Sequence, residues 1–236
     1  MTPEGGVRDV VLLHGLGRTA SSFLAMRLAM QRAGYTVHAQ TYPSRRHDVA
    51  TLARLAVPRA LRCAEGRRAH VVSHSMGAIL LRHHLAEHGQ DERIARCVML
   101  GPPNRGSEVI DAFGDIALFR AIIGPAGLQL GCDDASVPRR LGPVRAEVGV
   151  IAGGRATSPI LARIIGRASD GKVAVDATPV EGMRDFIVLP VGHTFMMASP
   201  LVIAQTLSFL RGGAFERDLT RRTALQRLAG MAADAR

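Results

Sequence analysis

The sequence predicts an α/β fold in three layers, with helices on both faces of a mostly parallel sheet of six strands. Short apolar runs alternate along the chain with helical patterns, which is typical of successive strand–helix–strand units. The apolar runs are nearly continuous, as in strands that are buried on both faces. The chain has 236 residues, of which 47% are hydrophobic, so it is long enough for one domain with a full core.

Each expected element follows from a local pattern. Strands are predicted at the apolar runs 10–13, 36–41, 70–73, 97–100, 148–152 and 186–190. Helices are predicted at residues 22–34, 48–63, 76–88, 110–123 and 199–210. Asp48 and Ser199 are suitable N-caps, while Gly34, Gly89 and Gly212 end or follow helical patterns. No internal repeat or linker divides the sequence.

The formal net charge of +10 comes almost entirely from arginine, because Lys172 is the only lysine. The arginines are scattered along the chain and aromatic residues make up only 4% of it, so a stacking platform for bases is not expected. We therefore expect no nucleic-acid partner. Attraction to anionic lipid is the other functional interpretation of the charge.

Cysteine usage and hydropathy indicate a cytoplasmic protein. Cys63, Cys97 and Cys132 lie far apart and lack the spacing of a metal site, which favours free, buried thiols in a reducing compartment. The first residues show neither the basic start nor the apolar core of a secretion signal. Because no apolar run reaches about 18 residues, a membrane-spanning helix is not expected.

The strongest chemical signal lies between the third expected strand and the helix that follows it. There the chain reads SHSMG over residues 73–77, close to the G-x-S-x-G turn that presents a nucleophilic serine. Gly77 supplies the small residue required two positions after the nucleophile, whereas Ser73 stands where glycine is usual. We predict that Ser75 is the nucleophile; the alternative is that Ser75 only caps the helix.

Two backbone N–H groups are candidates for binding an oxyanion. Met76 begins the helix after the serine, where the helix dipole favours negative charge. Leu16 lies in the segment HGLG of residues 14–17, in which Gly15 and Gly17 let the backbone approach a substrate. We expect His14 to hold this loop by hydrogen bonds rather than to act as a base.

A serine nucleophile needs a base, and the base needs a carboxylate, in the chain order serine, acid, histidine for this kind of turn. His193 is the predicted base because it follows the last expected strand, at the carboxyl end of the sheet. Asp170 is the predicted acid. Because it precedes Gly171, the alternative is that it is only a turn residue. Asp176 is the second choice for the acid. The other later histidines are expected to face solvent: His83, His84 and His88.

Taken together, these motifs resemble the small bacterial lipases and esterases of the α/β-hydrolase superfamily. The resemblance runs from about residue 7 to residue 210 and rests on HGLG at 14–17, SHSMG at 73–77, NRGS at 104–107, SDGKV at 169–173 and VGH at 191–193. It implies Ser75, Asp170 and His193 as a catalytic triad, with Leu16 and Met76 as oxyanion-hole donors. Few residues precede the first expected strand, so it also implies a compact version of the fold that lacks the first two strands.

Two segments lie outside the regular pattern. Residues 110–140 include an apolar, glycine-rich stretch that is expected to form a small cap or to line an acyl pocket; the alternative is an ordinary packing helix and loop.

Residues 213–236 follow the hydrolase domain predicted at 1–212 and interleave arginines with leucines. This tail is predicted to be a C-terminal helix that lies on the domain or frays into solvent, and contact with a membrane surface is the alternative.

The sequence therefore predicts a serine hydrolase that cleaves carboxylic esters through an acyl-enzyme, with a small ester or a lipid as substrate. No metal or cofactor is implied. A thioesterase or an acyltransferase would use the same triad, and the motifs do not separate these activities. A binding protein that keeps the fold without turnover is the alternative from another class. No pattern indicates an oligomeric state.

Overall fold

The computed structural model describes residues 6–233, which contain a sheet of six strands in the order β2-β1-β3-β4-β5-β6. Every neighbouring pair of strands is parallel. The strands are β1 (Asp9–Leu13), β2 (Thr36–Ala39), β3 (Ala69–His74), β4 (Ile94–Leu100), β5 (Glu147–Gly153) and β6 (Asp185–Leu189). The predicted six-stranded parallel sheet is confirmed. The expectation that the chain has no secretion signal rests on its first residues, and residues 1–5 lie outside the described part.

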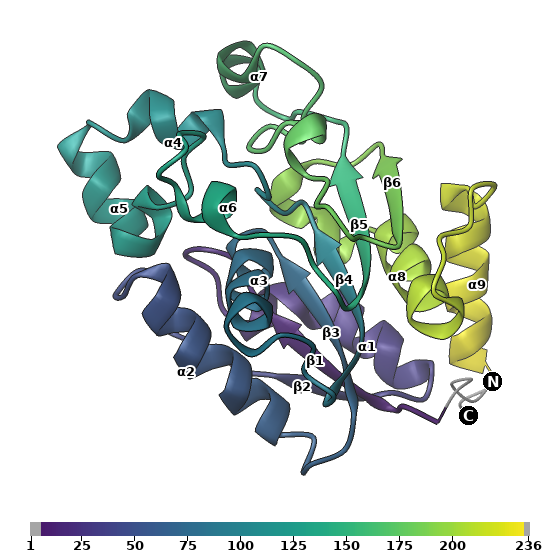
Figure 1. The fold of residues 1–236 in the computed structure, drawn as a ribbon. Helices are drawn as coiled ribbons and strands as arrows, with labels where there is room; N and C mark the ends of the chain where they lie inside the picture. The colour runs from purple at the N-terminus through teal and green to yellow at the C-terminus, as the bar shows by residue number, and fades with distance from the viewer. Residues whose placement is uncertain (1–5, 234–236) are drawn as a thin grey trace.

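Helices cover both faces of the sheet (Figure 1). The helices α2 (Val49–Arg62) and α3 (Met76–His88) pack on one face, and α1 (Leu24–Arg32) and α8 (Pro200–Gly212) pack on the other. Further helices of the described chain are η1 (Ala20–Phe23), α4 (Glu108–Phe113), α5 (Ala117–Leu128), α6 (Val137–Arg140), α7 (Pro159–Ile165), η2 (Val175–Ala177), η3 (His193–Ala198) and α9 (Arg221–Ala233), where η denotes a 3-10 helix. The three predicted layers are therefore present.

The sheet divides the apolar core in two. Along β1, Val11 and Leu13 pack with α2 and α3, whereas Val10 and Leu12 pack with α1 and α8. All residues of β1 are buried, which explains why this strand is a continuous apolar run in the sequence. Burial of each such side chain stabilises the fold by roughly 1.5–3 kcal/mol.

The helix predicted at 110–123 is wrong as a single element. The chain instead forms α4 and α5, separated by residues 114–116. A second break lies within α5, where Gly124 has a φ of 69°. A Cβ at Gly124 would lie 2.1 Å from the carbonyl oxygen of Arg45, so the close approach of that backbone requires glycine.

The tail helix α9 lies against α8 (Figure 1). Ala224 is fully buried, and Leu219, Leu228 and Met231 pack against the same core as α8. The tail therefore rests on the domain over residues 221–233, and its last residues, 234–236, lie outside the described part. No helix within residues 6–233 combines the length and the apolar character needed to cross a membrane.

Candidate active site

Ser75 lies in the sharp turn between β3 and α3. Its backbone has a φ of 53° and a ψ of −124°, a conformation that costs a residue other than glycine about 1–3 kcal/mol. The N–H of Ser75 donates to the carbonyl of Leu100 at 2.9 Å, which holds the turn against β4. A Cβ at Gly77 would lie 2.4 Å from the carbonyl oxygen of Leu13, so glycine is required there. Ser73 is fully buried and fits the position where glycine is usual.

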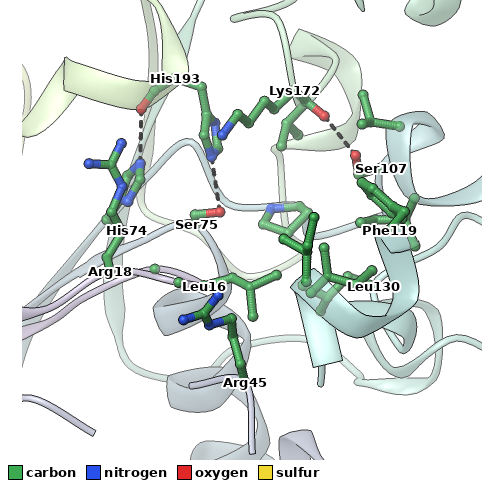
Figure 2. A pocket seen from close by; sticks show the side chains of 18 residues that line it. Leu16, Arg18, Arg45, His74, Ser75, Ser107, Phe119, Leu130, Lys172 and His193 are labelled. Carbon is green, nitrogen blue, oxygen red and sulfur yellow. Dashed lines mark hydrogen bonds between the residues drawn. The ribbon is translucent and has the colours of Figure 1, made fainter. Parts of the chain in front are cut away.

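His193 and Asp170 form a hydrogen-bonded chain with Ser75. Nε2 of His193 lies 3.0 Å from Oγ of Ser75 (Figure 2), and Nδ1 of His193 lies 2.7 Å from Oδ2 of Asp170. His193 begins η3 just after β6, and Asp170 lies in the connection after β5. Both side chains are buried. A carboxylate that accepts from Nδ1–H leaves Nε2 free to accept the serine proton.

The loop around Asp170 holds its carboxylate in place. Oδ1 accepts hydrogen bonds from the backbone N–H groups of Lys172 at 3.0 Å and Val173 at 2.8 Å. The carbonyl of Asp170 accepts from the N–H of His193 at 3.0 Å. Asp170 is therefore both a turn residue and the partner of the histidine, and these backbone contacts fix the distance between the two side chains.

The two predicted oxyanion donors are adjacent to this site. Within the described chain, the N–H groups of Leu16 and Met76 donate to no protein acceptor. Gly17 has a φ of 65°, a left-handed conformation that favours glycine. A Cβ at Gly15 would lie 2.9 Å from Nδ1 of His74. Both positions therefore favour glycine, and Leu16 between them belongs to the lining of the pocket beside Ser75.

A cavity of about 330 Å³ opens beside Ser75, a volume in the lower range of small-molecule sites. Figure 2 shows Ser75 and His193 on one side of this cavity and apolar side chains of α5 and the following segment on the other. The apolar wall consists of Val109, Ile110, Phe119, Ile122, Ile123 and Leu130. Residues 110–140 thus supply much of the lining of the pocket.

A family model described as "Alpha/beta hydrolase family" matches residues 10–234. The chain belongs to the alpha/beta hydrolase family. The match extends from β1 through the sheet and the pocket into α9, and it confirms the predicted superfamily. No protein of curated function shows a significant sequence match to this alpha/beta hydrolase.

Several solved structures share the fold of this alpha/beta hydrolase. The mature form of lipase BlEst2 from Bacillus licheniformis is 18% identical, with a TM-score of 0.70 over 89% of this chain and 94% of that chain. The metagenomic carboxyl esterase MGS0156 is 19% identical, with a TM-score of 0.66 over 99% of this chain and 77% of that chain. The type II thioesterase BorB from the borrelidin biosynthetic cluster is 16% identical, with a TM-score of 0.52 over 92% of this chain and 96% of that chain. Identities this low establish a shared fold alone.

His14 and Tyr42 hold the loop that carries Leu16 in this alpha/beta hydrolase. Nδ1 of His14 donates to the carbonyl of Gly15 at 2.9 Å, and Nε2 accepts from the N–H of Tyr42 at 3.1 Å. The hydroxyl of Tyr42 donates to the carbonyl of His14, and the two rings stack with centroids 3.9 Å apart. Burial lowers the pKa of His14, so the ring is neutral, as this pattern of one donor and one acceptor requires.

His74 supports His193 from the residue directly before the nucleophile. Its Nε2 donates to the carbonyl of His193 at 3.0 Å, and the two ring centroids are 4.9 Å apart. His74 is fully buried, and burial together with the nearby His193 holds its pKa well below the usual value. The sequence predicts no role for His74, and only its position directly before Ser75 sets it apart there.

The other histidines of α3 do not join the site. His84 is buried and hydrogen-bonds to Asp91 at 2.9 Å, so the prediction that it faces solvent is wrong. Nδ1 of His83 lies 3.5 Å from Glu87 and its side chain is only 16% exposed, so it too is largely covered. The physical reason is that α3 is packed on most of its sides. His88 is exposed, as predicted.

The remaining candidate groups also lie apart from Ser75. The fallback acid Asp176 is exposed and pairs with Arg167 at 2.7 Å. All three cysteines are free. Cys97 is buried, whereas Cys63 and Cys132 are half-buried. The prediction of buried thiols is therefore wrong for Cys63 and Cys132. Among residues 6–233, no three His, Cys, Asp or Glu side chains are arranged to hold a metal ion.

Proposed function

We propose that this alpha/beta hydrolase cleaves carboxylic esters with Ser75 as nucleophile, His193 as base and Asp170 as the orienting acid. The observation that supports this most strongly is the continuous hydrogen-bonded chain from Ser75 through His193 to Asp170, with distances of 3.0 Å and 2.7 Å. The strained turn supports it further, because a serine that only capped α3 would not need a φ of 53°.

Acylation begins when Oγ of Ser75 attacks the ester carbonyl carbon and Nε2 of His193 takes the serine proton. The carboxylate of Asp170 stabilises the resulting imidazolium through Nδ1–H. The carbonyl oxygen gains the negative charge, and the N–H groups of Leu16 and Met76 donate to it. Each such donor is typically worth about 3–4 kcal/mol in the transition state.

The tetrahedral intermediate then loses its alcohol. Nε2–H of His193 gives its proton to the leaving oxygen as the ester C–O bond breaks, which leaves an acyl group on Ser75. A water molecule attacks this acyl-enzyme while His193 accepts a proton from the water. Collapse of the second intermediate releases the carboxylic acid and restores the serine hydroxyl.

The apolar wall of the cavity indicates where the acyl chain lies. Phe119, Ile122 and Leu130 face the space beside Ser75, and apolar burial favours an acyl chain there by about 0.8 kcal/mol per methylene. The names of two structures with this fold, a lipase and a carboxyl esterase, agree with such a substrate.

Thioester hydrolysis is a second candidate, because one structure with this fold is a thioesterase by name and the same groups would act. Measuring kcat/KM for octanoyl-CoA and for p-nitrophenyl octanoate with the same enzyme preparation distinguishes a thioesterase from an esterase. An added alcohol acceptor tests acyl transfer in the same assay. A ratio in favour of the thioester by more than about tenfold would replace the ester assignment.

A fluorophosphonate probe tests the nucleophile and the non-catalytic alternative together. We expect the probe to label Ser75, as located by mass spectrometry, because only an activated serine reacts quickly. The variant Ser75→Ala should lose the label, and Ser73→Ala should keep it. No labelling of the wild type, or labelling elsewhere, would favour a binding protein on the hydrolase fold.

We also propose that the enzyme is cytoplasmic. Its three cysteines are free in the structure, and free thiols are typical of reducing compartments. Cell fractionation tests this, and recovery of the protein outside the cytoplasm would contradict it.

A further inference from the structure

The cavity beside Ser75 has a cationic side as well as an apolar one. Arg18, Arg45 and Lys172 all belong to its lining, and no acidic residue of the described chain does. Figure 2 shows Lys172 extending toward His193, with Arg18 on the side of the cavity opposite Phe119. Arg18 and Lys172 therefore lie beside the reacting groups, whereas the backbone of Arg45 packs against Gly124 of α5.

These three cations have no carboxylate partner in the part of the chain that the structure describes. Some arginines elsewhere pair with a carboxylate, such as Arg96 with Glu147 at 2.7 Å and Arg227 with Glu216 at 2.6 Å, and others do not, so it is the gathering of these cations in one cavity that sets them apart. Unpaired charges that gather in one cavity are the usual preparation for an anionic ligand.

The contacts of Arg18 place it beside the base. Its guanidinium donates to the carbonyl of Thr194 at 2.8 Å, next to His193 in the chain, and lies 5.8 Å from the ring centroid of Phe195. Lys172 is two residues after Asp170, the partner of His193. Burial and, less strongly, the nearby Arg18 lower the pKa of Lys172.

The position of His193 identifies the part of the substrate that meets these charges. In ester cleavage the leaving oxygen receives its proton from Nε2 of His193, so the leaving group must lie beside this ring. The apolar wall of α4 and α5 lies on the other side and receives the acyl chain. Arg18 and Lys172 therefore face the leaving group.

We propose that the preferred substrates are esters whose leaving alcohol carries an anionic group, a phosphate or a carboxylate, bound by Arg18 and Lys172. This inference rests on the proposed ester hydrolysis. Arg45, on the wall below Leu16 (Figure 2), adds to the positive potential. Guanidinium and ammonium groups form charge-assisted hydrogen bonds with both kinds of anion, and the guanidinium can bind either one with two hydrogen bonds.

Two matched pairs of octanoyl esters test this proposal. The first pair is 3-octanoyloxy-4-nitrobenzoate and 2-nitrophenyl octanoate, which differ by one carboxylate on the leaving phenol. The second is 1-octanoylglycerol 3-phosphate and 1-octanoylglycerol, which differ by one phosphate. We expect kcat/KM of the wild type to favour the anionic member of at least one pair, and the pair with the larger ratio identifies the anion.

The variants Arg18→Gln and Lys172→Gln should each lower that ratio by about 5- to 10-fold, and the double variant should lower it further. Lys172→Glu should reverse the preference. Arg46→Gln is the matched control, since Arg46 is exposed and does not line the cavity; it should leave the ratio unchanged. Added salt should reduce the ratio of the wild type.

The outcomes separate this inference from the function on which it rests. If the wild type cleaves the neutral esters but shows no charge preference in either pair, or keeps its preference in the double variant, the anionic leaving group is wrong and ester hydrolysis stands. If the wild type cleaves none of the four esters, the proposed function fails and this inference fails with it.

Discussion

The carboxylate of Asp170 determines which nitrogen of His193 carries the proton. Oδ2 lies 2.7 Å from Nδ1, while Oδ1 is occupied by the N–H groups of Lys172 and Val173. The carboxylate can therefore offer His193 only an acceptor, so Nδ1 keeps its proton and Nε2 can accept that of Ser75. An amide in this position would place its NH₂ group toward His193, because the backbone donors require the oxygen at the other site.

We expect Asp170→Asn to lower kcat for ester hydrolysis by about 10³–10⁴-fold, because the amide favours the wrong tautomer of His193. Steady-state kinetics on p-nitrophenyl octanoate measures this. The matched control is Asp176→Asn, which removes only the surface pair with Arg167 and should change kcat by less than about twofold. Asp170→Asn with more than about a tenth of wild-type kcat would contradict this role.

Single residues were predictable where chain order limits the choice. Ser75 has a strand–turn–helix signature, and few acids and histidines follow it at the end of a strand, so the three side chains of the hydrogen-bonded chain could be selected from the sequence. His74 could not be given its role in this way. Its partner is the carbonyl of His193, 119 residues away, and a backbone acceptor leaves no trace in the sequence.

At the scale of elements, Arg82 joins α3 to α6 and to the loop after β4. Its guanidinium donates to the carbonyl and the side-chain oxygen of Asn104 and to the carbonyls of Pro138, Leu141 and Gly142. Arg82 is buried, and burial lowers its pKa to about 10. Because all these acceptors are neutral oxygens, the contact with α6 and its neighbouring loops depends on one buried charge.

Arg82→Met should lower the free energy of unfolding by about 3 kcal/mol, since several buried carbonyls lose their donor. For a chain of this size the melting temperature should fall by roughly 10 °C. Calorimetry or circular dichroism measures the shift. Arg54→Gln is the matched control, because Arg54 pairs with Glu87 at the surface and its loss should lower the melting temperature far less. Equal shifts in the two variants would contradict the anchoring role of Arg82.

The elements that the sequence predicted well are those with a strong local pattern. The strands follow continuous apolar runs, and α2 begins at Val49 after the N-cap Asp48, whose side chain accepts from the N–H of Thr51. The break between α4 and α5 was missed although Gly114 and Asp115 lie in it, because apolar residues are frequent on both sides of it. The helix α7 was also missed, although Ser158 as N-cap and Pro159 at the first position are recognisable start signals.

At the scale of the whole molecule, several histidines are buried in the neutral form. Burial is the main cause that lowers the pKa of each: His14, His70, His74 and His84. In the unfolded chain these rings take up a proton below about pH 6.5. The unfolded state then binds more protons than the folded state, so the free energy of unfolding must fall as the pH decreases below this value.

We expect the stability measured by urea unfolding to fall between pH 7.5 and pH 5. For His70, burial lowers the pKa from 6.5 to about 4, so this residue alone contributes on the order of 1–2 kcal/mol to the loss. His70→Gln should be less stable at pH 7.5 but should show a pH dependence smaller by that amount. The same pH dependence in both proteins would contradict the assignment of His70 as a buried neutral ring.

The most direct test of the central claim is the hydrolysis of p-nitrophenyl esters from acetate to palmitate by the wild type and Ser75→Ala. We expect the wild type to be active, with a preference for acyl chains that fill the apolar side of the cavity, and Ser75→Ala to lose on the order of 10⁶ in kcat. The chain-length profile then separates an esterase from a lipase. An inactive wild type across the series, or a Ser75→Ala variant that retains activity, would contradict the account.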